Sequence, residues 1–322
     1  MLTRRASRLP ALARAGDDDF ATAVLDGLSR PQRALPCRFF YDARGSELFE
    51  EITRLPEYYP TRTETAILEA HAAQMAEGVP GGGILVEFGS GSSLKTEILL
   101  RQLPKLGAYV CVDVSESALS DAGRRLVARF PKLDVRPIVR DFSHPVAFPV
   151  DLAERPKTGF FPGSTIGNLT PVEAQRLLRV FRTDLSPDGR LIVGVDLKKD
   201  ARQLVLAYDD SRGVTAAFNL NLLTRINREL GGTFNLEAFE HQAVYNPRDG
   251  RIEMYLQSRC CQEVEVRGRR FAFQAGERIH TENSYKYAIS QFQDLARSAG
   301  WQPRRVWTDR NDLFSVHELV SP

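Results

Sequence analysis

The chain has 322 residues, 43% hydrophobic and 26% charged, which is typical of a folded globular protein and excludes a disordered or fibrous one. Its 43 basic and 41 acidic residues give a formal net charge of +2, which supplies no electrostatic reason to expect a nucleic-acid or membrane partner. No apolar run approaches the roughly 20 residues that span a bilayer, and the N-terminus lacks the apolar core of a secretory signal. We therefore expect a cytoplasmic protein in which residues 1–20 form a flexible tail.

The four cysteines show no metal-binding or disulfide pattern. They are Cys37, Cys111, Cys260 and Cys261, and no C-x-x-C or Cys/His ligand spacing occurs among them. The sequence therefore predicts four ordinary thiols in a reducing compartment and no metal site.

The middle of the chain alternates between short apolar segments and segments with helical spacing. A capping box at Thr170 and Glu173, with Pro171 at the first helical position, marks one helix start. This alternation predicts an α/β fold with a mostly parallel, doubly wound Rossmann-type sheet. The strands are expected at 84–88, 108–114, 135–142, 159–164 and 190–197, and the helices at 95–103, 115–130 and 171–183.

Two regions break the alternation. Residues 1–60 are rich in aromatic residues and turn formers, and 198–286 first have helical spacing and then alternate like strands around a turn at 246–250. A helix and a closing hairpin follow. We therefore predict a cofactor-binding domain from 61–196 and 287–322, and an α+β substrate-binding domain from 1–60 and 197–286. The ligands should lie at the carboxyl ends of the strands, beneath the second domain.

A glycine-rich turn follows the first predicted strand. It reads Glu87-Phe88-Gly89-Ser90-Gly91, and glycines there permit a tight turn and let the backbone approach a ligand. A dinucleotide fingerprint requires a third glycine at position 94, where this chain has Leu94. The loop therefore does not form a pyrophosphate cradle and instead suits S-adenosylmethionine, which carries no phosphate.

Acidic residues end the next two predicted strands. Asp113 lies where a carboxylate can accept hydrogen bonds from both ribose hydroxyls of a nucleoside. Asp141 and Phe142 lie where an adenine needs an acceptor for its amino group and a wall for its ring. Each acid alone is equally consistent with a helix cap or a solvated loop, but the three features at successive strand ends favour a cofactor site.

Further motifs resemble the histidine Nα-methyltransferases of ergothioneine biosynthesis. The resemblance runs from about residue 30 to the C-terminus, and its most specific parts are PEYYPTR (56–62) and GSTIGNLTP (163–171). It is supported by FYD…GSELF (40–49), AYDD (207–210), IEM (252–254) and TENSYK (281–286). The family also includes methyltransferases that act on tryptophan-like substrates, so membership alone does not identify the amino acid.

The resemblance implies a Rossmann-type methyltransferase with an added substrate domain, acting on the α-amino group of L-histidine. Three methyl transfers would give the betaine hercynine. By motif matching, the cofactor would contact Gly89, Lys95, Asp113, Asp141 and Phe142. The amino acid would be held by Tyr58, Asn168, Tyr208, Glu282 and Ser284, in a pocket lined by Tyr41, Phe49, Gly163 and Met254.

The chemistry of these residue types agrees with those roles. The reaction needs alignment and an amine with a free lone pair, and a pocket beside a sulfonium disfavours the ammonium form. Tyr41 and Tyr58 can orient the amine and relay its proton, although phenols are poor bases at pH 7. Asn168 and Tyr208 supply donors for a carboxylate.

Glu282 and Ser284 form the predicted substrate-reading pair. Two residues apart in a strand, they point to the same face, where a carboxylate accepts from an imidazole N–H and a hydroxyl contacts the other ring nitrogen. A tryptophan site would have no use for that carboxylate and would need more apolar space near Met254.

Several alternatives stay open at this level. Another amino acid such as tryptophan is the strongest, followed by a non-catalytic S-adenosylmethionine-binding protein. A dehydrogenase is disfavoured by Leu94, and a nucleic-acid base methyltransferase by Phe161-Pro162-Gly163-Ser164 in place of a D/N-P-P-Y/F loop. The chain is expected to act as a monomer on a small molecule.

Overall fold

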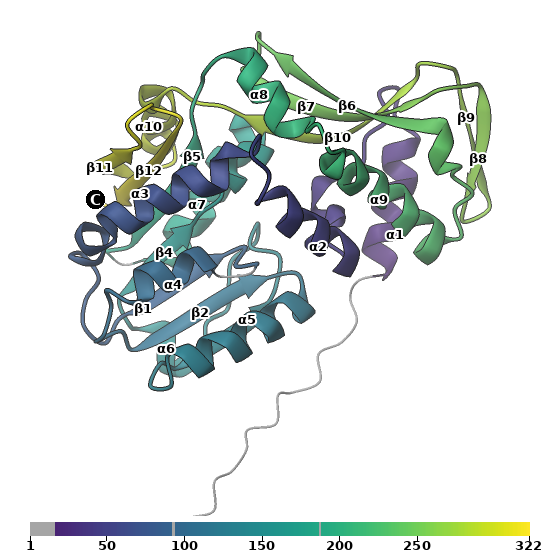
Figure 1. Cartoon of the computed structure of the whole chain (residues 1–322). Coiled ribbons are helices and arrows are strands. Elements are labelled where there is room, and N and C mark those ends of the chain that lie inside the picture. Colours follow the sequence, from purple (N-terminus) through teal and green to yellow (C-terminus); the bar gives the residue numbers. More distant parts are fainter. Residues whose placement is uncertain (1–16, 92–93, 187) are drawn as a thin grey trace, which may run out of the picture.

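A seven-stranded sheet forms the centre of the structure, a computed structural model that describes residues 17–91, 94–186 and 188–322 (Figure 1). Its strand order is β11-β12-β5-β4-β1-β2-β3. Strands β1 to β5 are parallel, whereas β12 pairs antiparallel with both β5 and β11. The predicted mostly parallel α/β fold is therefore confirmed. The strands are β1 (Ile84–Phe88), β2 (Ala108–Asp113), β3 (Val135–Val139), β4 (Lys157–Phe161), β5 (Arg190–Asp196), β11 (Gln302–Thr308) and β12 (Phe314–Val320).

Helices cover both faces of this sheet. Successive side chains of a strand point to opposite faces, so Val86 packs in one buried cluster and Leu85 in another. The Val86 cluster includes α6 (Val150–Ala153), α7 (Pro171–Asp184) and α10 (Ile289–Ser298). The Leu85 cluster includes α3 (Tyr59–Ala76), α4 (Leu94–Leu100) and α5 (Glu116–Arg129). Burial on both faces explains why β1, β2, β4 and β5 are largely apolar.

Local signals set several boundaries as predicted. The side chain of Thr170 accepts a hydrogen bond from the backbone N–H of Glu173, and the side chain of Glu173 accepts one from the backbone N–H of Thr170. The predicted capping box is therefore confirmed. Strands β2 and β5 end one residue earlier than predicted, whereas β3 ends at Val139, not 142, and β4 ends at Phe161, not 164. The chain after β4 turns because Gly163 and Ser164 have φ values of 84° and 57°. Such left-handed values are unusual for serine and often mark functional sites.

The remaining elements build a second layer of structure above the strand ends (Figure 1). One buried cluster joins side chains of residues 20–59 with those of 204–279. Its strands form the sheets β10-β7-β6 and β8-β9. The elements are α1 (Asp17–Leu28), η1 (Cys37–Phe40), α2 (Ala43–Ile52), α8 (Ala201–Tyr208), α9 (Val214–Leu230), η3 (Leu236–Ala238), β6 (Phe239–Asn246), β7 (Arg251–Ser258), β8 (Gln262–Val266), β9 (Arg269–Phe273) and β10 (Arg278–Tyr285).

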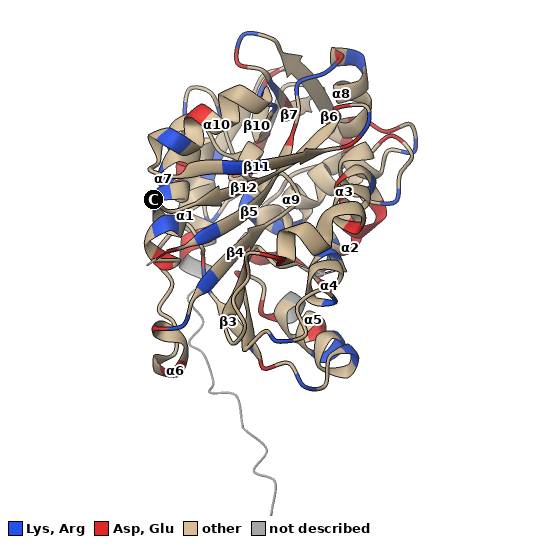
Figure 2. Ribbon diagram, turned by 90° about the vertical axis from the view of Figure 1, so that its left-hand side faces the viewer, with Lys and Arg blue, Asp and Glu red and all other residues tan. Residues whose placement is uncertain are grey.

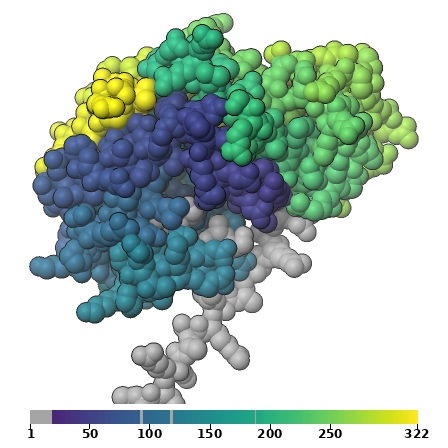
Figure 3. All heavy atoms as spheres, in the orientation of Figure 1, coloured from purple at the N-terminus to yellow at the C-terminus, as the bar shows by residue number. Residues whose placement is uncertain are grey.

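The separate buried clusters support the two-domain division, which we retain as a proposal. In the space-filling view, the purple segment near the N-terminus lies between the teal sheet region and the green region of 200–280 (Figure 3). The predicted tail is too long at one end, because residues 17–20 belong to α1 and Phe20 is buried. Residues 1–16 lie outside the described part.

The surface and the helices show two further properties. Basic and acidic positions are interspersed over the ribbon in this view, without a face of one sign (Figure 2). Among the described residues, no helix combines the length and apolar character needed to cross a membrane.

Candidate active site

The glycine turn and an acidic residue meet at the carboxyl ends of β1 and β2. Gly89 and Gly91 have positive φ values of 71° and 45°, which glycine adopts without strain. The carboxylate of Asp113 accepts from the backbone N–H of Gly91 at 3.0 Å and from that of Ser115 at 2.9 Å. These bonds fix the carboxylate beside the turn. Positions 92 and 93 of the loop lie outside the described residues.

Phe142 closes this crevice from the loop after the third strand, β3. A Cβ atom on Gly89 would lie 3.2 Å from the Phe142 ring, so a larger residue at position 89 would push the ring out of its place. The ring also packs edge-on against Phe161, with centroids 5.5 Å apart. Asp141 lies two residues past β3, where it accepts from the N–H of Ser143 at 2.8 Å. A glycine cradle, an aromatic wall and a carboxylate therefore meet, and these groups fit an adenosyl cofactor.

Lys95 is linked to the turn after β4 by a buried acidic residue, Glu64, which bonds to both. Its ammonium pairs with the Glu64 carboxylate, which accepts from the Gly163 N–H at 2.9 Å. A side chain on Gly194 would collide with Glu64 at 2.1 Å, so β5 leaves room for this acid. Glu64 was not predicted from the sequence. It anchors the Gly163 turn to α3, and the proposed cofactor role of Lys95 stays a prediction.

Glu282 lies buried on β10, opposite Met254 of β7. The two residues are register partners, with exposures of 8% for Glu282 and 2% for Met254. The Glu282 carboxylate has no hydrogen-bond partner among the described residues. Burial raises the pKa of this carboxyl to about 7, although the ammonium of Lys286 opposes the rise. An unpaired buried carboxylate is costly, so a ligand N–H is the partner that this geometry suits.

Aromatic side chains form a continuous wall beside Glu282. The ring centroids are 5.6 Å apart for Tyr41 and Phe49, 6.3 Å for Phe49 and Tyr58, and 6.2 Å for Tyr58 and Tyr208. Burial raises the pKa of Tyr41 and of Tyr58 well above 10, and the charge of Glu282 adds to both shifts. Neither phenol can therefore act as a base near pH 7, which agrees with an orienting or proton-relaying role.

Asn168 lies at the end of η2 (Thr165–Asn168), a short helix that packs against β10. A Cβ on the preceding Gly167 would lie 2.7 Å from the carbonyl oxygen of Tyr285. Glycine at 167 therefore lets the loop after β4 approach the strand that carries Glu282 and Ser284. This close approach places the predicted carboxylate-binding loop next to the predicted imidazole-reading strand.

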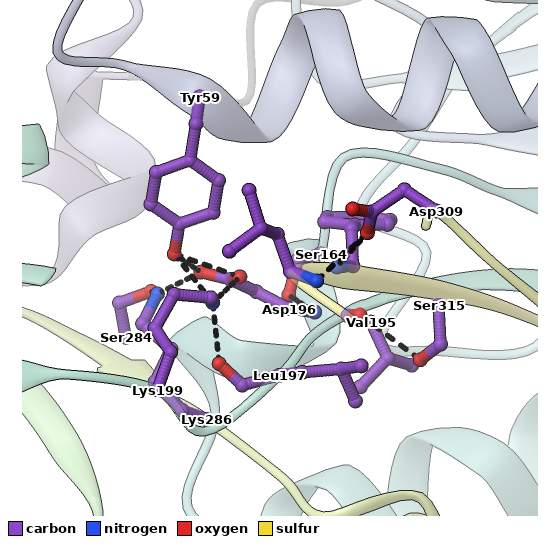
Figure 4. A network of polar contacts seen from close by, with 12 residues as sticks. Tyr59, Ser164, Val195, Asp196, Leu197, Lys199, Ser284, Lys286, Asp309 and Ser315 are labelled. Carbon is purple, nitrogen blue, oxygen red and sulfur yellow. Dashed lines mark hydrogen bonds and ion pairs between the residues drawn. The ribbon is translucent and has the colours of Figure 1, made fainter. Parts of the chain in front are cut away.

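A buried charge network joins the central sheet to β10 (Figure 4). Asp196, the last residue of β5, pairs with Lys286 at 2.7 Å and with Lys199 at 2.6 Å, and accepts from the Tyr59 hydroxyl at 2.8 Å. Burial alone would raise the pKa of Asp196, but the two ammonium groups hold it below its usual value. Burial lowers the pKa of Lys199 to about 8.

The same network ends at two predicted substrate residues. Lys286 donates to Ser284 Oγ at 2.7 Å and to the Tyr208 hydroxyl at 2.9 Å, and these two oxygens are 2.7 Å apart. The sequence did not predict roles for Asp196, Lys199 or Tyr59, and it gave Lys286 only as part of a motif. A usable signal was the pair Lys198-Lys199, which directly follows the predicted strand 190–197.

The sheet and its carboxyl edge define the class of protein, a Rossmann-type S-adenosylmethionine-dependent methyltransferase. Residues 20–321 match the model of the family described as histidine-specific methyltransferase, SAM-dependent. The chain therefore belongs to this family.

Curated relatives are similar along most of the chain. A histidine N-alpha-methyltransferase of Mycolicibacterium smegmatis is 42% identical, with 92% of this chain and 93% of the relative covered. The protein of the same name from Mycobacterium tuberculosis is 41% identical, with 91% and 92% covered. Among solved structures, the CcbJ methyltransferase of Streptomyces caelestis aligns with a TM-score of 0.47 and 15% identity, over 84% of this chain and 98% of that one.

Proposed function

We propose that this protein transfers methyl groups from S-adenosylmethionine to the α-amino nitrogen of L-histidine. Three transfers would give hercynine, for ergothioneine biosynthesis. The observation that carries the choice of histidine is the Glu282 carboxylate, which is 8% exposed and unpaired among the described residues. Ser284 lies two residues farther along β10, on the same face of the strand, so the two side chains can meet the two nitrogens of an imidazole.

The residues of this chain would act by alignment and desolvation. S-adenosylmethionine, when bound, supplies an electrophilic methyl group on a sulfonium. Gly89, Asp113 and Phe142 would hold its adenosyl part, with Lys95 and Asp141 at the edges of the same crevice. Asn168 and Tyr208 would hold the main-chain end of the amino acid, while Tyr41 and Tyr58 orient the amine and pass its proton to water. Alignment of this kind supplies a large part of the rate of displacement reactions.

The direct test is incubation with S-adenosylmethionine and an equimolar mixture of free amino acids, read by mass spectrometry. We expect histidine to gain 14, 28 and then 42 mass units while the other amino acids stay unchanged. Methylation of tryptophan instead would overturn the choice of substrate. Cofactor binding without any methylated product would favour the non-catalytic alternative. We further propose a cytoplasmic monomer, which sedimentation and fractionation would test.

Tyr58→Phe should lower kcat by about 2- to 13-fold and leave the affinity for S-adenosylmethionine unchanged. The reason is the loss of one hydrogen bond to the reacting amine, which contributes about 0.5–1.5 kcal/mol. Stopped assays at saturating substrates give kcat, and calorimetry gives the cofactor affinity. The matched control is Tyr245→Phe on β6, an edge strand that β7 separates from β10. Equal turnover of the two variants would remove Tyr58 from this role.

A further inference from the structure

Lys286 occupies an unusual position behind the substrate-reading pair. Its side chain is fully buried, and its Nζ lies beside Asp196 and Ser284 (Figure 4). The hydroxyl oxygen of Tyr208 is its third contact. An ammonium has three N–H donors and no acceptor. All three are therefore used within the protein, and none reaches the substrate.

The hydroxyl groups of Ser284 and Tyr208 complete a triangle with this ammonium. Each oxygen accepts one hydrogen bond from Lys286, and the two oxygens are 2.7 Å apart, so one hydroxyl donates to the other. A hydroxyl has one proton and two lone pairs. The oxygen that accepts from its neighbour has then used both lone pairs and can only donate outward. The triangle thus offers exactly one proton to the pocket.

The chemistry of the two groups indicates which oxygen carries that proton. Either hydroxyl could donate to the other, and the inferred arrangement has Tyr208 donating to Ser284, because a phenol is a better hydrogen-bond donor than an alkyl hydroxyl. Ser284 then accepts from Tyr208 and Lys286 and points its own proton into the pocket. The remaining lone pair of Tyr208 can accept from the substrate amine, which leaves the substrate carboxylate to Asn168.

We propose that Lys286 is a positioning residue that makes Ser284 an obligate donor, so that the site accepts histidine only with a neutral imidazole ring. A ring nitrogen that receives the Ser284 proton must be unprotonated, and the other nitrogen donates its N–H to Glu282. An imidazolium would place an N–H against the Ser284 proton, close to a buried ammonium. This inference rests on the proposed function, because it specifies the ring state that the same pocket binds.

Few other groups near the pocket change charge between pH 5.5 and 8. Burial raises the pKa of one cysteine and four tyrosines near Glu282 and Lys286, so these stay neutral. The groups are Cys37, Tyr41, Tyr58, Tyr59 and Tyr208. Asp196 stays ionised, while the pKa values of Glu282 (about 7) and Lys199 (about 8) lie near the range. Two histidines also lie close: His241 contacts the carbonyl oxygen of Tyr208 at 2.8 Å and His280 is on β10, and burial lowers the pKa of both. A test must therefore cancel the titration of all these protein groups.

A reference ligand achieves this. 1,2,4-Triazole-3-alanine offers a ring N–H and a ring acceptor, as histidine does, but its ring stays neutral over this range. Calorimetry in the presence of S-adenosylhomocysteine gives the Kd of each ligand. We expect the ratio of the histidine Kd to the triazolylalanine Kd to rise about tenfold from pH 8 to 5.5, because the free imidazole has a pKa of about 6.5. A constant ratio in the wild type would overturn the proposal, as would loss of triazolylalanine binding at pH 8.

The variant Lys286→Met tests the residue itself. Without the ammonium, Ser284 regains a free lone pair and can accept an N–H from an imidazolium, so the ratio should stay within about twofold across the pH range. The matched control is Lys198→Met, an exposed lysine next to the cluster, which should keep the wild-type slope. A wild-type slope in Lys286→Met would show that Lys286 does not set the ring state.

The two proposals fail differently. If the enzyme methylates no histidine at any pH, the proposed function is wrong. If it methylates histidine but the wild-type Kd ratio does not change with pH, only the role of Lys286 is wrong. The wild-type measurement needs no variant, so it decides the matter even if Lys286→Met does not fold.

Discussion

Replacing Glu282 by glutamine is expected to lower kcat/KM for histidine by about 10- to 150-fold, while the affinity for S-adenosylmethionine stays unchanged. A hydrogen bond to a charged group contributes about 1.5–3 kcal/mol, and the amide cannot supply that charge to the imidazole N–H. Initial rates at saturating cofactor measure the loss. Unaltered histidine kinetics would remove Glu282 from substrate recognition.

The same variant should be more stable than the wild type at pH 8. Burial raises the pKa of folded Glu282 from 4.5 to about 7, so the folded state binds more protons than the unfolded state between these values. The wild type therefore loses stability as the pH rises through this window, by about 3 kcal/mol at most. Glutamine carries no charge and avoids this loss. We expect the Tm of Glu282→Gln to exceed the wild-type Tm by a few degrees at pH 8, with little difference at pH 4.5.

Glu253→Gln is the matched control from the neighbouring strand. Glu253 is 7% exposed, like Glu282, but its carboxylate accepts from Tyr255, Asn246 and Arg251. Burial alone would raise its pKa, yet these hydrogen bonds hold the pKa below its usual value. Its contribution to stability is therefore present above pH 4.5 and is lost as the pH falls. Glu253→Gln should lower the Tm at pH 8 and leave histidine use unchanged. If both variants gained Tm, burial alone, and not the lack of a hydrogen-bond partner, would explain the stabilising effect of Glu282→Gln.

The parallel sheet and the cofactor edge could be predicted from the sequence for a simple reason. A parallel strand buried on both faces is a continuous apolar run, and its loops meet at one edge of the sheet. The positions of Gly89 and Asp113 at successive strand ends therefore place them together. The Gly89–Val112 and Gly91–Asp113 hydrogen bonds show that the glycine turn lies beside the end of β2. The face shared by Glu282 and Ser284 was also predictable, because the irregularity in β10 lies before Glu282.

Helix α3 and the buried charges could not be predicted in this way. Helix α3 buries residues around much of its circumference, including the acid Glu64, so its apolar residues do not form one clear stripe. The partners in the Asp196–Lys286 pair are far apart in the sequence, and each charged residue alone indicates a solvated surface. The fold brings these residues together, and no local spacing contains that information.

Replacing Asp113 by asparagine is expected to weaken S-adenosylmethionine binding by about 100-fold or more. The backbone N–H groups of Gly91 and Ser115 occupy one acceptor site on each carboxylate oxygen, at 3.0 and 2.9 Å. The remaining lone pairs can accept both ribose hydroxyls. An asparagine must place its NH2 against one of the two backbone donors, so the variant loses a ribose contact and the order of the turn. Two charge-assisted bonds at about 1.5 kcal/mol each account for this loss.

Calorimetry with S-adenosylmethionine measures the effect, and the matched control is Asp134→Asn. Asp134 precedes β3 at the opposite end of the strands and pairs with Arg136 at 2.7 Å, so its replacement should leave the cofactor Kd within about twofold. At saturating cofactor, the KM of Asp113→Asn for histidine should stay near the wild-type value, since Asp113 makes no contact with the β10 residues in the structure described. Equal cofactor affinity in the two asparagine variants would mean that Asp113 only orders the glycine turn, and the ribose would need another acceptor.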